Sequence, residues 1–144
     1  MQYTRRMNQI TQTLSTETNG PGLYEITRPV ISWCKEQAIQ DGLLTLFIQH
    51  TSASLTIQEN ADPDVRHDLQ DFFSSIAPQN GTYRHSAEGP DDMPAHIKSA
   101  LTQTQLTIPF TLGRLALGTW QGIYVFEHRL QRQNRRVVMH LMGD

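Results

Sequence analysis

Three of the six histidines stand at positions that neither a helix face nor an apolar core requires. His50 precedes a run of small polar residues, His85 lies in a long polar segment, and His96 lies near the start of a short predicted helix. Three neutral imidazoles with one open position are the ligand set of a catalytic zinc site. The sequence contains no HExxH motif, so only the fold can bring the three together. Ordinary structural or surface histidines are the alternative.

Two glutamates are candidates for acid–base chemistry. Glu59 lies shortly before a predicted helix, and Glu127 lies in a predicted strand. Glu127 alternates with Arg129, so the two side chains share one face of that strand, and a structural ion pair is the more ordinary interpretation. Asp91 and Asp92 are interpreted as loop and helix-capping residues.

Hydroxyl and cationic side chains predict an anion-binding site. Thr51, Ser52 and Ser54 supply hydroxyl groups, and Arg129 and Lys98 supply positive charge. The sequence contains neither a Walker motif nor a GxGxxG motif, so a standard nucleotide-binding loop is not supported.

An aromatic and an amide side chain, Trp120 and Gln121, stand between glycines in the segment GTWQG over residues 118–122. Glycines there permit a strand bend or a close backbone approach. A packed tryptophan at a β-bulge is the ordinary interpretation, and a pocket wall that stacks a flat heterocycle is the functional one. His128 shares the phase of an apolar strand face, so we expect a buried, hydrogen-bonded histidine there.

The apolar pattern predicts a single α+β domain over residues 1–144, with mainly antiparallel strands and two to three helices. Residues 43–49 form a continuous apolar run with the length of a buried strand. Further strands are predicted over residues 3–14, 23–27, 50–58, 106–110, 119–130 and 136–142. The last two are expected to pair as a hairpin around Gln133-Asn134. Residues 77–93 predict a long loop.

Capping residues and spacing predict the helices. The first is capped by Thr27 and ends at Asp41-Gly42. The second has Asp62 as its cap and Pro63 in its first turn. Its apolar face consists of Val65, Leu69, Phe72, Phe73 and Ile76. The third runs from about residue 93 to residue 101 with Asp92 as its cap. Its inward residues are predicted to be Ile97, Ala100 and Leu101.

Length and composition limit the classes of protein. A chain of 144 residues suits one domain with a sizeable core. The net charge of −2 and the pI of about 6.3 give no electrostatic footprint for nucleic-acid binding. The single cysteine, Cys34, excludes an intrachain disulfide. No apolar run reaches the roughly 20 residues of a membrane helix, and no signal-peptide core is present. We therefore expect a cytoplasmic protein that binds neither nucleic acid nor membranes.

Four segments together resemble the YjbQ-like, UPF0047 family. They are HTSASLTIQENADPDVRHDL (50–69), Arg84-His85 followed by Glu88-Gly89, MPAHIKSAL (93–101) and GRLALGTWQGIYVFEHR (113–129). The resemblance extends from about residue 3 to residue 142. It implies a small α+β fold that assembles as a homotrimer and carries a metal-binding histidine cluster. It also implies a secondary thiamine-phosphate synthase activity, which joins hydroxymethylpyrimidine diphosphate to thiazole phosphate and releases pyrophosphate.

The resemblance assigns roles to particular residues. His50, His85 and His96 match the motif histidines of the family, and they would hold a divalent ion, with zinc as the first choice. The other motif positions are matched by Glu59, Asn60, Trp120, Gln121 and Glu127. The leading hypothesis is a homotrimeric, metal-dependent enzyme acting on a phosphorylated small molecule. A hydrolase suits the ligand set equally well. The alternatives are a non-catalytic trimer that binds a metal or small ligand, and a purely structural trimer.

In the leading hypothesis, Glu59 or Glu127 is the acid or base. The substrate contacts are predicted to come from Thr51, Ser52, Ser54, Asn60, Trp120, Gln121 and Arg129. Among them, the two serines and the arginine would hold phosphate, and the tryptophan would stack the pyrimidine.

Overall fold

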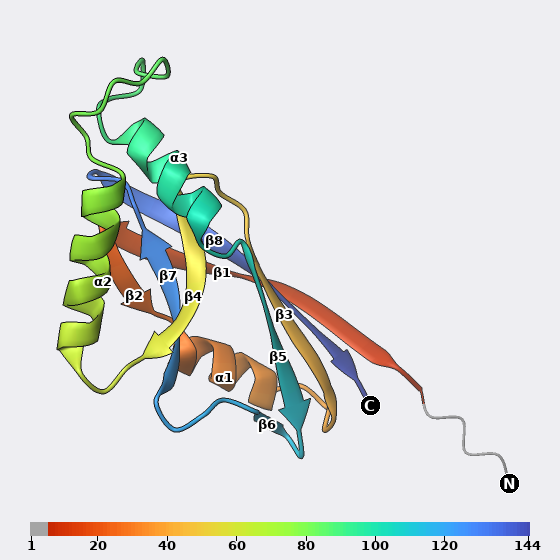
Figure 1. Cartoon of the computed structure of the whole chain (residues 1–144). Helices are drawn as coiled ribbons and strands as arrows, with labels where there is room; N and C mark the ends of the chain where they lie inside the picture. Colours follow the sequence, from red (N-terminus) through yellow and green to blue (C-terminus); the bar gives the residue numbers. More distant parts are fainter. Residues whose placement is uncertain (1–5) are drawn as a thin grey trace, which may run out of the picture.

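The computed structural model describes residues 6–144, which form two antiparallel β-sheets and three helices (Figure 1). The strands of the larger sheet are β1 (Asn8–Asn19), β3 (Gly42–Ile48), β5 (Gln105–Thr111), β6 (Arg114–Leu115) and β8 (Arg132–Gly143). Those of the smaller sheet are β2 (Gly22–Glu25), β4 (Ala53–Glu59) and β7 (Gln121–Glu127). The helices are α1 (Thr27–Lys35), α2 (Pro63–Ile76) and α3 (Asp92–Leu101). The strand orders are β1-β8-β3-β5-β6 and β2-β7-β4.

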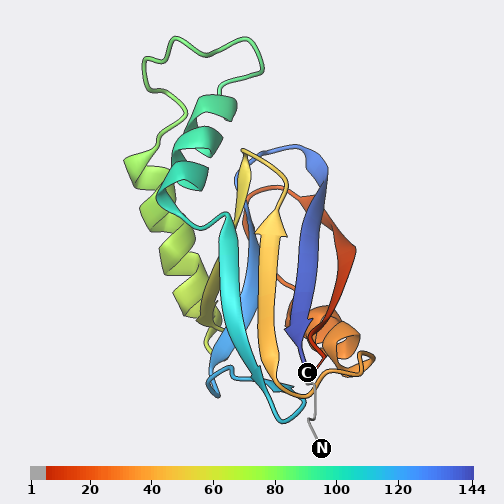
Figure 2. The same ribbon diagram turned by 90° about the vertical axis from the view of Figure 1, so that its right-hand side faces the viewer.

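The apolar core contains side chains from both sheets and from α1. In β3, Leu44, Leu46 and Ile48 are buried in this core, whereas Leu43 and Phe47 on the other face are 38% and 45% exposed. Figure 2 shows this outer face of the larger sheet turned toward the viewer, with no helix of the described residues across it. The apolar run predicted as a buried strand is therefore a strand with one buried and one open face.

β7 and β8 follow one another in the sequence but belong to different sheets. β7 pairs with β2 and β4, whereas β8 pairs with β1 and β3. The predicted hairpin around Gln133-Asn134 is therefore wrong, because both residues lie within β8 and face β1. β1 also extends to Asn19, beyond the predicted end at residue 14, and residues 3–5 lie outside the described part of the chain.

α2 confirms the second predicted helix and its cap. The carboxylate of Asp62 accepts a hydrogen bond from the backbone N–H of Asp64 at 2.9 Å. No residue of α2 is buried, however, and Phe72 and Ile76 are 57% and 42% exposed. The helix packs on the smaller sheet only in part, so much of its predicted apolar face remains open within one chain.

The other two helices differ from their predictions. Thr27 does not cap α1, because it is the first helical residue and its hydroxyl accepts from the backbone N–H of Ile123. α1 also ends at Lys35, before the predicted stop at Asp41.

α3 is turned differently from the prediction, and Asp92 is its first residue and not its cap. The buried positions of the helix are Asp92, Pro94, Ala95 and Lys98. The predicted inward residues Ala100 and Leu101 are exposed, and Ile97 is half-buried. The charged side of the helix can face inward because Arg129 pairs with Asp92 there.

The predicted α+β architecture with mainly antiparallel strands is confirmed. Across residues 6–144, none of the helices has the length and apolar character needed to cross a membrane. The fold places the C-terminal end of β7 beside the start of α3, since Arg129 reaches Asp91 and Asp92. This junction contains the candidate site.

Candidate metal centre and adjoining pocket

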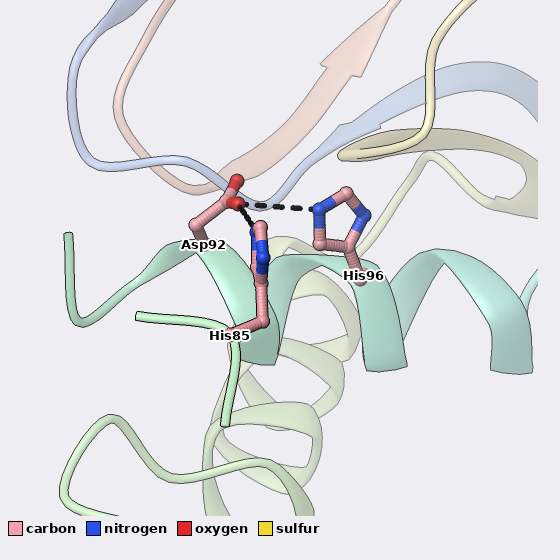
Figure 3. A group of neighbouring side chains, drawn as sticks. All are labelled: His85, Asp92 and His96. Carbon is pink, nitrogen blue, oxygen red and sulfur yellow. Dashed lines mark hydrogen bonds and ion pairs between the residues drawn. The ribbon is translucent and has the colours of Figure 1, made fainter. Parts of the chain in front are cut away.

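Two imidazoles and one carboxylate meet at the start of α3. Asp92 is the first residue of the helix, His96 follows one turn later, and His85 comes from the loop before it (Figure 3). Oδ2 of Asp92 lies 2.5 Å from Nε2 of His85 and 3.2 Å from Nε2 of His96. These potential ligand atoms all lie within 4.8 Å of one another. The three side chains can therefore share one metal ion.

The contact of His96 with Thr51 directs its other ring nitrogen at Asp92. Nδ1 of His96 lies 3.0 Å from the carbonyl oxygen of Thr51. A carbonyl only accepts, so Nδ1 carries a proton and donates it to Thr51, and Nε2 is the nitrogen that faces the carboxylate of Asp92. At 3.2 Å from the carboxylate oxygen, Nε2 is placed either to donate a proton to Asp92 or to share a metal ion with it. Metal-binding histidines commonly donate their other N–H to a backbone carbonyl in this manner.

Asp92 is the central member of the group. Its side chain is 2% exposed, and its Oδ1 accepts from NH1 of Arg129 at 2.6 Å. Burial alone would raise the pKa of this carboxyl, but the hydrogen bond with His85 and the charge of Arg129 outweigh burial and lower the pKa. Asp92 therefore stays charged, as a metal ligand must. This role was not predicted from the sequence, because locally Asp92 resembles a helix cap.

Arg129 was predicted to bind phosphate and to share an ion pair with Glu127. The expected pair is wrong, because the Arg129 side chain binds residues at the start of α3. Its Nε donates to Asp91 at 2.9 Å, its NH1 to Asp92, and its NH2 to the carbonyl oxygen of Glu88 at 3.0 Å. Each of its three nitrogens already has an acceptor, so the guanidinium is poorly placed to hold a phosphate.

His50 lies apart from the other two predicted histidine ligands. Its Nε2 accepts from the backbone N–H of Arg136 at 2.9 Å, and its Nδ1 lies 3.3 Å from the guanidinium of Arg135. Burial, followed by the charges of these two arginines, lowers the pKa of His50. The structure therefore groups His85 and His96 with Asp92 and does not add His50. His50 and His96 nevertheless line the same pocket.

That pocket has a volume of about 670 Å³. Its apolar lining includes Phe47, Ile48 and Ala100, and its hydroxyl groups include those of Thr51, Ser52 and Ser99. Within the described residues, Oγ of Ser99 is buried without a hydrogen-bond partner. Of the predicted substrate-binding residues, Thr51 and Ser52 are the two that line this pocket.

Arg135 lies behind Ser52. It was not predicted as a site residue, because nothing in the local sequence distinguishes it from its neighbour Arg136. Its NH2 donates to Oγ of Ser52 at 3.0 Å and to the carbonyl oxygen of Ser52 at 3.2 Å. A guanidinium only donates, so Oγ of Ser52 must accept, and its own proton remains available for a ligand. Ser52 is therefore oriented as a donor beside a buried positive charge.

Glu127 is fully buried and holds Arg135 in place. Its two carboxylate oxygens accept from the hydroxyl of Thr18, from Nε and NH2 of Arg135, and from the backbone N–H groups of His128 and Arg129. Burial would raise the pKa of Glu127, but the hydrogen bonds from Arg135 and Thr18 lower it. This saturated, charged carboxylate suits an anchor better than the acid–base group that was predicted.

Ser54 and His128 bond to each other inside the domain. Oγ of Ser54 lies 3.0 Å from Nε2 of His128, and both residues are buried. Burial, followed by the charge of Lys98, lowers the pKa of His128 to about 3. The expectation of a buried, hydrogen-bonded His128 is confirmed. Ser54, predicted to bind substrate, lies behind the pocket and not in its lining.

Four predicted residues lie at the opposite end of the smaller sheet. Glu59 pairs with Gln121 at the far end of β4, which starts directly after the pocket-lining residues 51–52. Seven extended residues of about 3.3 Å each place this end about 20 Å from the pocket. Asn60 donates its backbone N–H to the carbonyl oxygen of Trp120, whose side chain is 60% exposed. These residues therefore do not contact the pocket of their own chain.

Comparisons with known proteins give a consistent result. The profile of the family described as UPF0047 protein YjbQ-like matches residues 11–144. A UPF0047 protein of Synechocystis is 50% identical over 128 residues, which are 88% of this chain and 87% of the relative. The UPF0047 protein YjbQ of Escherichia coli O157:H7 is 44% identical over 134 residues, which are 92% and 97% of the two chains.

Solved structures agree with the fold. The crystal structure of an uncharacterised YjbQ/UPF0047 protein from Clostridium acetobutylicum matches with a TM-score of 0.79 and 38% identity, over 90% of this chain and 97% of that one. A YbjQ-like protein of unknown function from Sulfolobus solfataricus matches with a TM-score of 0.89 over 96% and 100% of the two chains. At 19% identity, this second likeness concerns the fold alone.

Proposed function

The chain belongs to the UPF0047, YjbQ-like family, and we propose that it is a metal-dependent enzyme acting on a phosphorylated small molecule in the pocket beside His96. His85, Asp92 and His96 would hold a divalent ion. Zinc is the first choice, because two imidazoles and one carboxylate are a common ligand set of catalytic zinc. The proposal keeps two of the predicted histidine ligands and replaces His50 with Asp92.

The observation that carries the proposal is the convergence of Nε2 of His85 and Nε2 of His96 on one oxygen of the buried Asp92, while Nδ1 of His96 donates to Thr51. A divalent ion would take the place of the protons between these three side chains. When bound, such an ion supplies Lewis-acid chemistry, by polarising a phosphoryl oxygen or by lowering the pKa of a water molecule. The chain itself supplies the ligands, their orientation and the pocket beside them.

The pocket supports a substrate that combines a phosphate with an apolar part. The free hydroxyl proton of Ser52, with the guanidinium of Arg135 behind it, suits an anionic oxygen. Phe47 and Ala100 offer apolar contact in the same pocket. Two reactions fit these features, namely thiamine-phosphate synthesis and the hydrolysis of a phosphoester. We propose to assay both with the metal present.

We also propose that the chain acts as a homotrimer. The exposed Phe72 and Ile76 of α2 support association, because soluble monomers rarely leave such side chains grouped on one open helix face. Glu59 and Trp120 can reach a pocket only on a second copy, because they lie about 20 Å from the pocket of their own chain. In such an assembly Glu59 would be the acid or base and Trp120 would stack the pyrimidine.

The metal content of purified, untagged protein tests the proposed centre. We expect nearly one zinc or other transition-metal ion per chain in the wild type, and less than a tenth of that in His96→Ala. His50→Ala should keep its metal, because His50 lies outside the ligand group. Elemental analysis measures all three. A metal-free wild type, even after incubation with excess zinc, would overturn the proposal. Loss of metal in His50→Ala would instead restore the three-histidine site.

Turnover distinguishes an enzyme from a non-catalytic metal-binding protein. Glu59→Gln should keep its metal and lose most activity if Glu59 acts on a neighbouring pocket. Mixing Glu59→Gln chains with His96→Ala chains should then restore part of the activity. In a mixed assembly, a pocket with an intact His96 on one chain can receive an intact Glu59 from the other. Stoichiometric metal without turnover of any phosphorylated substrate would favour the non-catalytic alternative.

A further inference from the structure

Arg129 connects two parts of the chain that are far apart in the sequence. It follows the end of β7, and its guanidinium crosses to the segment that starts α3. The acceptors of its three nitrogens all come from residues 88–92. The Arg129 side chain is 15% exposed, and those of Asp91 and Asp92 are 9% and 2% exposed. Such nearly buried, charge-assisted bonds define geometry far better than exposed pairs do.

We propose that Arg129 is a positioning residue of the metal centre, which it serves by binding one oxygen of Asp92 so that the other stays directed at His85 and His96. This inference rests on the proposed function. NH1 of Arg129 binds Oδ1 at 2.6 Å, and the two histidines share Oδ2. Without Arg129, the carboxylate could rotate and present either oxygen. Partners that orient a metal ligand commonly change metal affinity 10–100-fold when they are lost.

Asp91 holds the guanidinium in the correct orientation. Its Oδ2 accepts from Nε of Arg129 and also from the backbone N–H of Leu130, both at 2.9 Å. NH2 of Arg129 binds the carbonyl oxygen of Glu88. A lysine at this position would keep the charge but could not reach all three acceptors in one plane.

Titration of the metal-free protein with Co²⁺ tests the inference, because the visible absorption of bound Co²⁺ reports on its ligands. We expect Arg129→Lys to bind Co²⁺ 10–100-fold more weakly than the wild type. The absorption bands of the saturated variant should also shift, which a general loss of stability would not cause. The matched control is Arg132→Lys, since the Arg132 side chain is 74% exposed and pairs only loosely with Glu17. This control should bind Co²⁺ as the wild type does.

The outcomes separate the inference from the proposed function. If the wild type binds no Co²⁺, the metal centre itself is wrong. If the wild type binds Co²⁺ and Arg129→Lys matches it in affinity and spectrum, the positioning role is wrong. If Arg129→Lys does not fold, Asp91→Asn is the variant to measure. It weakens the bond from Nε of Arg129 to residue 91 and keeps the bond between Arg129 and Asp92. It should weaken Co²⁺ binding several-fold, and unchanged binding would overturn the inference.

Discussion

Ser52 depends for its position on a buried ion pair behind it. The side chain of Arg135, 4% exposed, bridges the carboxylate of Glu127 and both oxygens of Ser52. A buried charge that loses its partner is strongly destabilising, whereas an exposed pair contributes little. The same two residues therefore link the stability of the fold to the shape of the pocket.

Glu127→Gln should lower the free energy of unfolding by about 3 kcal/mol, because it leaves Arg135 buried beside a neutral amide. Glu17→Gln is the control, since the side chains of Glu17 and Arg132 are 75% and 74% exposed and lie 3.7 Å apart. The control should change stability by less than about 0.5 kcal/mol. Urea denaturation measures both variants. If both variants lost the same free energy of unfolding, the buried pair of Glu127 and Arg135 would contribute no more to stability than the exposed pair.

Residue types at the site were easier to predict from the sequence than residue partners. His85 and His96 stood out because no helix face or core explained them, and the structure places them together. Asp92 did not stand out, because its neighbours are those of an ordinary helix start. Its partner Arg129 is 37 residues away, and only the fold brings the two into contact. Glu127 was predicted as an acid–base candidate with Arg129 as its ordinary partner, but its five donors come from distant strands as well as from neighbouring residues.

At the scale of the element, the capping residue of α2 carries much of the local stability of the helix, since its apolar face is poorly buried. We expect Asp62→Ala to cost about 1 kcal/mol, because the backbone N–H of Asp64 loses its acceptor. Asp68→Ala, at an exposed position in the middle of the helix, is the control and should change stability far less. Thermal unfolding followed by circular dichroism compares them. A similar effect of both changes would contradict the capping role.

Elements with strong local signals were predicted well. The cap, the proline and the apolar spacing of α2 all agree, so its position followed from the sequence. The pairing of strands did not follow, because adjacency in sequence favoured a hairpin of β7 with β8. The four residues between them carry the chain from one sheet to the other instead. The orientation of α3 was wrong for a related reason, since distant charges turn its polar side inward.

At the scale of the whole molecule, the open face of α2 is the feature that a single chain leaves unexplained. If the chain forms a homotrimer through this face, Phe72→Glu should shift it toward the monomer, because the contact would have to bury a charge. Ser74→Glu, at another exposed position of the same helix, should leave the trimer intact. Light scattering coupled to size-exclusion chromatography gives the mass directly. An unchanged trimer in Phe72→Glu would place the contact elsewhere.

The position of β8 affects how a new chain can fold on the ribosome. β8 is synthesised after every other described strand, yet in the larger sheet it lies between β1 and β3. While the ribosome still holds β8, these two earlier strands have no common neighbour, and the edges that β8 will cover are open to other chains. The larger sheet therefore closes only after β8 has been released. Until then, nascent chains on one messenger are exposed to pairing with each other, and chaperones would be needed most at this stage.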